Sequence, residues 1–145
     1  MIAVDTNILV YAHRTDSTWH DRAEACTRGL AEATAPWVIP QPCLHEFCAI
    51  VTRAGIYSPP STLAAALTQI DHWLESPSLT ICGESPRHWA TLRRLLTQAK
   101  ATGAVVHDAR ISAICLDHGV SALWTADRDF SRFRGLRAVN PLVTS

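Results

Sequence analysis

Four acidic residues stand where a folded chain can bring carboxylates together. They are Asp5, Glu46, Asp108 and Asp127. Asp5 and Asp127 each follow an apolar segment that we predict to be a strand, while Asp108 and Glu46 lie near the starts of two predicted helices. Ligands bind in open α/β sheets at the carboxyl ends of the strands. We therefore expect these four carboxylates to meet at one edge of a sheet.

Such a group of carboxylates needs a neutralising partner. Two unit charges 4 Å apart repel by about 4 kcal/mol at an effective dielectric constant near 20. Four groups contain six pairs, so the sum rivals the roughly 5–15 kcal/mol that stabilises a whole domain. Protons or cations must offset this repulsion. Oxygen ligands without nearby histidine or thiol favour a hard ion, which predicts Mg²⁺, with Mn²⁺ able to substitute.

Each acid also has a simpler explanation. An aspartate at a helix start is often an N-cap, worth about 1 kcal/mol, and Glu46 could lie on a solvated face. Asp129 is an alternative to Asp127, because both lie in the segment 125–130. We prefer Asp127, which is closer to the end of the predicted strand.

The rest of the chain predicts how these residues are positioned. Apolar segments bounded by proline, glycine or polar residues predict strands at 2–4, 35–40, 79–82, 121–125 and 137–139. Helical spacing of apolar residues predicts helices at 8–13, 18–33, 41–54, 62–74, 85–101 and 107–115. Strands that alternate with helices form a mainly parallel sheet with helices on both faces. The fold class is therefore α/β, with three layers and about five strands.

Details of three helices are also predicted. The first should have Thr6 or Asn7 near its cap. The core-facing stripe of helix 62–74 should contain Leu63, Leu67, Ile70 and Leu74. That of helix 85–101 should contain Trp89, Leu92, Leu95 and Leu96.

The composition indicates one globular domain over residues 1–145. No signal peptide is expected, because Asp5 interrupts the first apolar run, and no segment reaches the roughly 20 apolar residues of a membrane span. Five cysteines without framework spacing indicate thiols in a reducing compartment, so we expect a cytoplasmic protein. The net charge of zero argues weakly against nucleic-acid binding by bulk charge alone.

The acidic motifs, in this order, resemble those of one family. The motifs are Asp5-Thr6-Asn7, Glu46, Asp108-Ala109-Arg110-Ile111, and Thr125-Ala126-Asp127-Arg128-Asp129-Phe130. The chain resembles a PIN domain over nearly its whole length, and within that family the VapC type of toxin ribonuclease from bacterial toxin–antitoxin systems. The resemblance implies a Mg²⁺- or Mn²⁺-dependent endoribonuclease on a five-stranded parallel sheet. It further implies inhibition by a cognate antitoxin, a homodimer, and products with 5′-phosphate and 3′-hydroxyl ends.

The resemblance also assigns roles residue by residue. Asp5 and Asp108 match metal-binding acids, and Glu46 and Asp127 match the other two members of the quartet. The residues that match ligand-orienting positions are Thr6, Asn7 and Thr125. Arginines near the acidic motifs in sequence are candidates to hold the RNA backbone; they are Arg14, Arg110, Arg128 and Arg132.

Three other interpretations of the sequence stay open. A phosphatase with an aspartate nucleophile would carry a second acid where this chain has Asn7, and its lysine could only be Lys100. A PIN-fold binding module would act through protein contacts, with an idle acidic site. A third alternative is an RNA-processing nuclease without a toxin role. For a protein partner, Trp19 and Tyr57 are candidate surface anchors.

Overall fold

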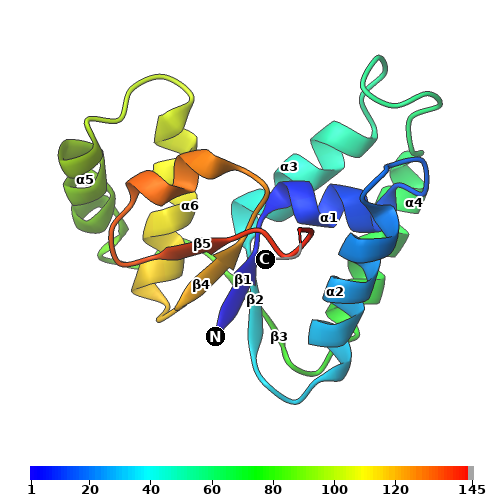
Figure 1. Cartoon of the computed structure of the whole chain (residues 1–145), viewed down its shortest axis with the longest axis horizontal. Helices are drawn as coiled ribbons and strands as arrows, with labels where there is room; N and C mark the ends of the chain where they lie inside the picture. Colours follow the sequence, from blue (N-terminus) through cyan, green and yellow to red (C-terminus); the bar gives the residue numbers. More distant parts are fainter. Residues whose placement is uncertain (144–145) are drawn as a thin grey trace.

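The computed structural model describes residues 1–143 as a five-stranded parallel sheet between two layers of helices (Figure 1). The strands are β1 Ile2–Val4, β2 Trp37–Pro40, β3 Leu79–Cys82, β4 Ala122–Trp124 and β5 Arg137–Val139. Their order is β3-β2-β1-β4-β5, and every pair of neighbours is parallel. This confirms the α/β class and the five-stranded parallel sheet predicted from the sequence.

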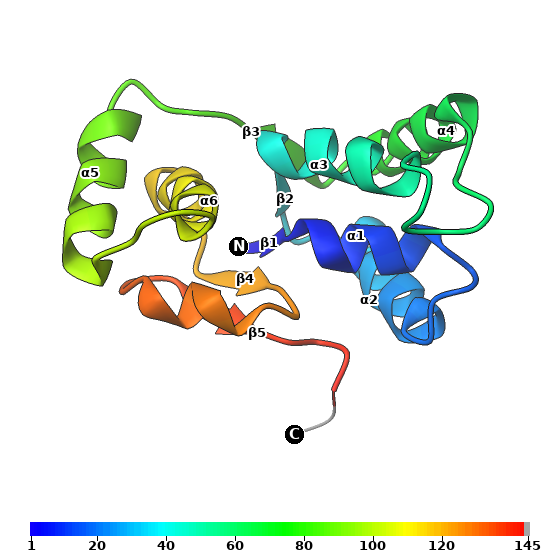
Figure 2. The same ribbon diagram turned by 90° about the horizontal axis from the view of Figure 1, so that it is seen from above.

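Six α-helices and a short 3₁₀-helix complete the fold. They are α1 Thr6–His13, α2 His20–Glu32, α3 Gln41–Val51, α4 Leu63–Leu74, α5 His88–Ala99, α6 Val105–Asp117 and η1 Arg128–Arg132. Figure 2 shows α1 to α4 on one side of the sheet and α5 and α6 on the other, where η1 also lies. The predicted helices are all present, with ends that differ by a few residues. None of the helices within residues 1–143 is long and apolar enough to cross a membrane.

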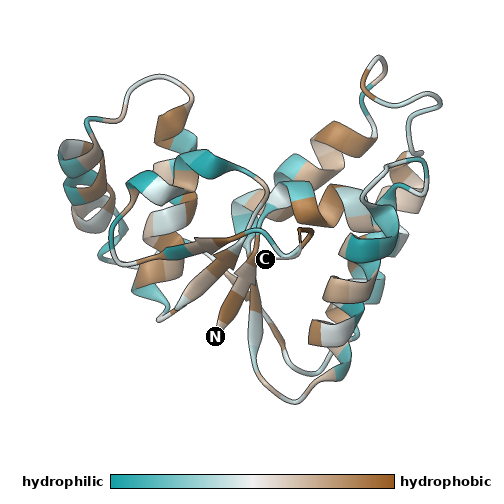
Figure 3. Ribbon diagram, in the orientation of Figure 1, coloured by the Kyte–Doolittle hydropathy of each residue, from teal (hydrophilic) through white to brown (hydrophobic). Residues whose placement is uncertain are grey.

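The central strand β1 and its neighbour β4 are buried on both faces. Ala3 and Val4 of β1 and Leu123 of β4 are fully buried, as expected for a parallel sheet covered by helices. Beyond each strand the chain becomes polar at once, at Asp5 after β1 and at Thr125 after β4. Figure 3 shows hydrophobic strands in the centre of the molecule with hydrophilic residues on the helices around them. The polar side chains therefore lie at the carboxyl ends of the strands.

The cap of the first helix differs from the prediction. α1 begins at Thr6, and its N-cap is Asp5, whose Oδ1 accepts a hydrogen bond of 2.7 Å from the Thr6 amide. Thr6 and Asn7 already lie inside the helix. Because the Asp5 carboxylate satisfies a free amide of the first turn, the helix starts directly at the end of β1.

The predicted core stripe of α4 is wrong at its three leucines, while Ile70 packs against the core as expected. Leu63, Leu67 and Leu74 are 63%, 47% and 50% exposed, and the buried residues of the helix are Ala66 and Trp73. The Trp73 ring packs edge-on against Phe47 of α3, with ring centroids 4.9 Å apart. This indole fills the space between the helices, so the buried face is turned away from the leucine stripe.

The core face of α5 was predicted in part. Leu92 and Leu95 are buried as expected, and Leu96 packs against the core. Trp89 is 64% exposed, contrary to the prediction, and His88 is buried in its place. The helix begins at His88, three residues after the predicted start. The buried positions 88, 92 and 95 lie on one face at helical spacing, and Trp89 lies outside that face.

Candidate functional site

Asp5 lies at the centre of a dense set of hydrogen bonds. Oδ1 accepts from the Thr6 amide, and Oδ2 accepts from Thr125 Oγ1 at 2.7 Å and from Asn7 Nδ2 at 3.3 Å. The side chain is 5% exposed. Burial raises the pKa of the Asp5 carboxyl, while the hydrogen bonds from Thr125 and Thr6 act in the opposite direction. The position of this carboxylate is thus fixed by its neighbours.

Asn7 and Thr125 connect the end of β1 to the end of β4. Asn7 Oδ1 accepts a 3.1 Å hydrogen bond from the Ala126 amide, and Asn7 Nδ2 donates to Thr125 Oγ1 at 3.2 Å. Thr125 Oγ1 also accepts from the Asp127 amide at 3.0 Å. These bonds hold the segment that carries Asp127 against the segment that carries Asp5.

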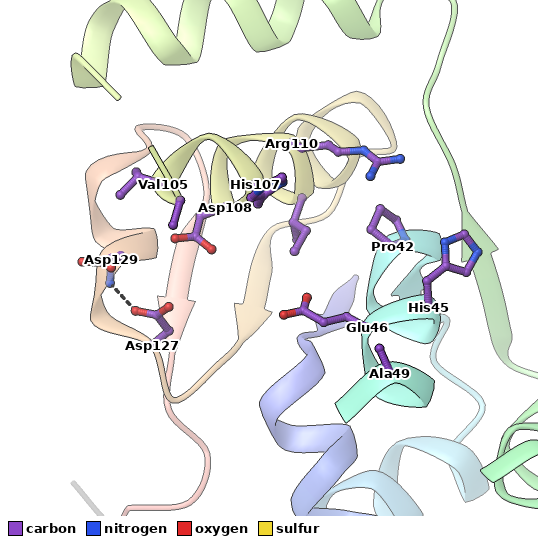
Figure 4. A pocket seen from close by; sticks show the side chains of 12 residues that line it. Pro42, His45, Glu46, Ala49, Val105, His107, Asp108, Arg110, Asp127 and Asp129 are labelled. Atoms are coloured by element: carbon purple, nitrogen blue, oxygen red, sulfur yellow. Dashed lines mark hydrogen bonds between the residues drawn. The ribbon is translucent and has the colours of Figure 1, made fainter. Parts of the chain in front are cut away.

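Glu46 reaches the same region from the other side. It lies in the second turn of α3, and its Oε2 accepts a 3.1 Å hydrogen bond from Thr6 Oγ1. The residue is exposed, yet Figure 4 shows its carboxylate directed across the cleft toward Asp108. The contact with Thr6 gives Glu46 a defined direction, which a freely solvated glutamate would lack.

Three further acids gather opposite. Asp108 in the first turn of α6 faces Asp127 and Asp129 of the segment that enters η1, and one oxygen of each lies within 4.8 Å of the others. Burial raises the pKa of Asp108 to about 6, with further contributions from the charges of Asp127, Asp5, Asp129 and Glu46. The carboxylates predicted from the sequence therefore converge in space.

The alternative to Asp127 joins the same group. Asp129 is exposed, and its amide donates a 2.8 Å hydrogen bond to Asp127 Oδ1. Asp127 thereby caps η1 with one oxygen and directs the other side of its carboxylate to the cleft (Figure 4). Asp127 therefore caps a helix and also belongs to the group of acids, as Asp5 does. By contrast, Asp108 lies inside α6 and is not the N-cap of that helix.

Four of the acids line a cleft of about 600 Å³ between α3, α6 and η1 (Figure 4); they are Glu46, Asp108, Asp127 and Asp129. The sequence analysis did not single out two histidines that line this cleft, His45 and His107, or the thiol of Cys43, which is buried against Asp5. His45 and His107 directly precede Glu46 and Asp108 in the sequence and line the cleft. Cys43 Sγ lies 3.6 Å from Asp5 Oδ1 and is fully buried. Both histidines stand next to a predicted acid in the sequence, and this could have indicated that they line the cleft. No pattern in the sequence indicated that Cys43 contacts Asp5.

The candidate arginines separate into different environments. Arg110 lines the cleft and donates from Nε to Glu84 at 2.8 Å. Arg128 and Arg132 are exposed on η1. Arg14 is bound to Asp16 by two hydrogen bonds, of 2.9 and 2.6 Å, and lies 4.6 Å from the centroid of the Tyr57 ring. Arg14 therefore stabilises the surface near the end of α1 and does not line the acidic cleft.

The candidate anchors and the thiols are also placed. Trp19 is 38% exposed, and Tyr57 is partly buried against Arg14.

All five cysteines are free thiols, of which Cys43, Cys82 and Cys115 are buried. Burial raises the pKa of Cys115 to about 12, so this thiol stays protonated. The five free thiols match the expectation from the spacing of the cysteines.

Comparison with known proteins identifies the family of the chain. The PIN domain profile matches residues 2–136. Ribonuclease VapC43 of Mycobacterium tuberculosis is 34% identical over 142 residues, which cover 98% of this chain and 96% of the relative. The chain therefore belongs to the PIN-domain family and, within it, to the VapC ribonucleases.

Two solved structures show how far the fold is shared. Mycobacterium tuberculosis VapC20, described as a sarcin-ricin loop cleaving toxin, superposes with a TM-score of 0.67 at 19% identity, covering 94% of this chain and 99% of the other. VapBC2 from Rickettsia felis, solved bound to a DNA fragment from its promoter, gives 0.68 at 23% identity, covering 97% and 98%. At these identities the likeness supports the fold.

Proposed function

We propose that this chain is a divalent-metal-dependent endoribonuclease toxin that a cognate antitoxin inhibits. The observation that carries the proposal is the convergence of Asp108, Asp127 and Asp129, with oxygens within 4.8 Å of one another, facing Glu46 across a cleft. Asp5 lies close enough for its charge to act on Asp108. The relatives named as VapC ribonucleases support the reaction class. The VapBC complex among the structural neighbours supports a partner protein.

The donor set fits a hard divalent cation. Its members offer carboxylate oxygens, as Mg²⁺ and Mn²⁺ prefer. Burial and the charges of the other acids raise the pKa of Asp108, and this repulsion between the carboxylates supports a bound cation. We assign Asp5, Glu46, Asp108 and Asp127 to holding the ion and the reacting groups around it, with Asp129 at the rim. When bound, such an ion lowers the pKa of a neighbouring water and offsets charge on the phosphate.

The protein's own groups then have separate tasks. Thr125, Asn7 and the Thr6 amide hold the Asp5 carboxylate in one orientation, and the Thr6 hydroxyl holds Glu46. Fixed acceptors of this kind bind a metal without reorganising when it arrives, which increases its affinity. The open side of the cleft leaves room for an RNA strand to bring its phosphate to the acids.

The antitoxin would inhibit most simply by covering the cleft. A basic side chain placed among the acids competes with the metal for the same negative charge. The partner's remaining contact area would be apolar. We also propose that the protein acts as a homodimer, as the VapC resemblance implies.

The test is expression in a bacterial host together with mapping of RNA ends. Wild type should arrest growth and generate new 5′-phosphate ends, and Asp5→Asn should do neither, because Asn keeps the size of the side chain and removes its charge. Circular dichroism of the purified variant verifies that it is folded. Co-expression of the cognate antitoxin should restore growth. Equal toxicity of wild type and Asp5→Asn would show that the acidic cleft does not cause arrest.

Purified protein distinguishes the remaining alternatives. RNA cleavage that requires Mg²⁺ or Mn²⁺ and is abolished by EDTA separates the nuclease from a binding module. Cleavage without growth arrest at high expression would favour an RNA-processing nuclease without a toxin role.

A further inference from the structure

The net charge of zero hides a strong separation of charge in the chain. Residues 84–143 carry nine of the thirteen lysines and arginines but five of the thirteen acids. The remaining eight acids and four cations lie in residues 1–83. The two segments correspond to the two sides of the molecule, because 84–143 form α5, α6, β4, η1 and β5, whereas 1–83 include α1 to α4 (Figure 2).

The acids of the cationic side are already engaged. Three of the five belong to the cluster in the cleft. Asp117 accepts hydrogen bonds of 2.7 Å from both Ser85 and Thr91, and Glu84 accepts from Arg110. On this side the exposed cations are Arg87, Arg93, Arg94, Lys100, Arg128, Arg132, Arg134 and Arg137. Outside the cleft, the surface of this side is therefore strongly positive.

The opposite side of the molecule, formed by residues 1–83, carries a net negative charge. Two of its four arginines are neutralised in salt bridges, Arg14 with Asp16 at 2.6 Å and Arg28 with Glu24 at 3.2 Å. An excess of four acids over cations remains in residues 1–83. A polyanion approaching this side meets net repulsion.

Cations lie at both ends of the cleft. Arg110 extends from α6 toward Pro42 and His45, at the end away from Asp127 and Asp129 (Figure 4). Its Nε is bound to Glu84, which leaves the two terminal nitrogens of the guanidinium for another acceptor. At the other end, Arg128 follows Asp127 and opens η1, and Arg132 closes it. No salt bridge joins Arg128 or Arg132 to a carboxylate within the described part of the chain.

We propose that the side formed by α6 and η1 holds the RNA backbone, with Arg110 at one end of the cleft and Arg128 and Arg132 at the other. The proposal rests on the nuclease function proposed above and adds the path of the substrate. A phosphate over the acids is repelled until a metal ion is present, so the flanking arginines hold the strand. Guanidinium groups suit phosphate oxygens because their donors form a planar fork. The strand then crosses the acids without lying over α1, α2 or α4.

The test measures binding of a fluorescent single-stranded RNA by anisotropy in EDTA, where cleavage does not occur. The double variant Arg128→Gln/Arg132→Gln removes two charges from the proposed surface. Arg28→Gln/Arg53→Gln removes the same charge from the other side of the molecule. At low salt the first should raise Kd about tenfold or more, and it should reduce the slope of log K against log salt by about 1.4, or about 0.7 per lost phosphate contact. The second should change Kd by less than about twofold.

Arg110→Gln separates the two ends of the cleft. It should also weaken binding and lower the salt slope, by about 0.7. Glu84→Gln leaves the arginine in place and should preserve the slope. Thermal melting of each variant verifies the fold. Equal weakening by both double variants, or unchanged binding in Arg128→Gln/Arg132→Gln, would overturn the proposed surface.

Cleavage in Mg²⁺ by the same proteins separates this proposal from the function on which it rests. Cleavage by wild type, combined with equal Kd values for the two double variants, rejects the surface and leaves the nuclease standing. Wild type that neither binds nor cleaves RNA rejects both. A selective loss of binding in Arg128→Gln/Arg132→Gln, with cleavage restored at higher RNA concentration, supports the surface.

Discussion

The hydroxyl of Thr125, at the end of β4, binds the carboxylate of Asp5, at the end of the neighbouring strand β1. Thr125 Oγ1 donates to Asp5 Oδ2 at 2.7 Å and accepts from the Asp127 amide at 3.0 Å. The residues are 120 positions apart in the chain, and both are almost completely buried. One hydroxyl therefore connects Asp5 to Asp127, in addition to the bonds that Asn7 forms between the same segments.

Replacing Thr125 by valine removes these bonds without changing the shape of the side chain. Asp5 loses its shortest side-chain donor, and the partly buried Asp127 amide loses its acceptor. We expect a loss of about 1–3 kcal/mol in the free energy of unfolding, measured with urea. RNA cleavage at saturating Mg²⁺ should fall about 10- to 100-fold, the range for residues that orient metal ligands. Thr125→Ser keeps the hydroxyl and should retain most of the activity. A Val variant as active as the Ser variant would assign Thr125 a packing role alone.

Asp127 and Asp129 can be compared by the same substitution. Asn at position 127 still accepts from the Asp129 amide, so η1 keeps its cap while the charge is lost. We expect Asp127→Asn to lower the single-turnover rate more than 100-fold and Asp129→Asn about tenfold, on the order expected for an outer residue. The reverse order would shift the ligand assignment by two residues, to Asp129.

The pKa of Asp108 predicts how the stability of the metal-free protein depends on pH. The folded protein holds this proton more tightly than the unfolded chain, because the pKa rises from 3.8 to about 6. The free energy of unfolding should therefore fall as pH increases from about 4 to about 6. In this range the unfolded chain has released the Asp108 proton, whereas the folded protein still holds it. Asp108→Asn in EDTA should raise Tm by a few degrees at pH 7 and have little effect at pH 4. An equal gain at both pH values would show that ionisation of Asp108 in the folded protein is not the cause.

The sequence predicted the central part of the site well for a simple reason. An apolar strand that ends in Asp5-Thr6-Asn7 can place these side chains only at the carboxyl edge of the sheet. The strand ending before Asp127 leads to the same edge. The pairing of β1 with β4, with Val4 opposite Trp124, brings those ends together. The alternation of strands and helices predicted the sheet, but no local pattern specifies the bonds that Asn7 and Thr125 form across it.

The faces of helices were harder to predict, since they depend on the neighbour against which each helix packs. In α4, three leucines and an isoleucine at helical spacing suggested a buried stripe, but all three leucines are exposed. The contact of Trp73 with Phe47 comes from two segments far apart in the sequence. The net charge of zero likewise conceals that residues 84–143 carry an excess of cations and residues 1–83 an excess of acids.

The packing of α4 gives a direct test of its orientation. Trp73→Ala removes a buried indole from its contact with Phe47 and should cost about 3–5 kcal/mol in the free energy of unfolding. Leu67→Ala, on the exposed side of the same helix, should change it by less than about 0.5 kcal/mol. Both values come from urea denaturation of the metal-free protein. A greater cost for Leu67→Ala would mean that the leucine stripe is buried in solution.

Binding of a divalent ion should stabilise the folded protein. An ion that binds only the native state at 100 times its Kd adds about 2.7 kcal/mol, which corresponds to a rise of roughly 5–10 °C in Tm for a domain of this size. We expect this rise for wild type with Mn²⁺ or Mg²⁺, and a much smaller one for Asp108→Asn, which loses a charge from the cluster of Asp108, Asp127 and Asp129.

Asp21→Asn is the matched control for this measurement, because it removes one charge from the exposed first turn of α2 and leaves the cleft unchanged. It should show the full wild-type shift. Calorimetric titration with Mn²⁺ then gives the affinity and the number of ions, and Asp108→Asn should bind at least about tenfold more weakly. Identical shifts in wild type, Asp108→Asn and Asp21→Asn would mean that the ion binds elsewhere on the protein, and the acids in the cleft would need another explanation.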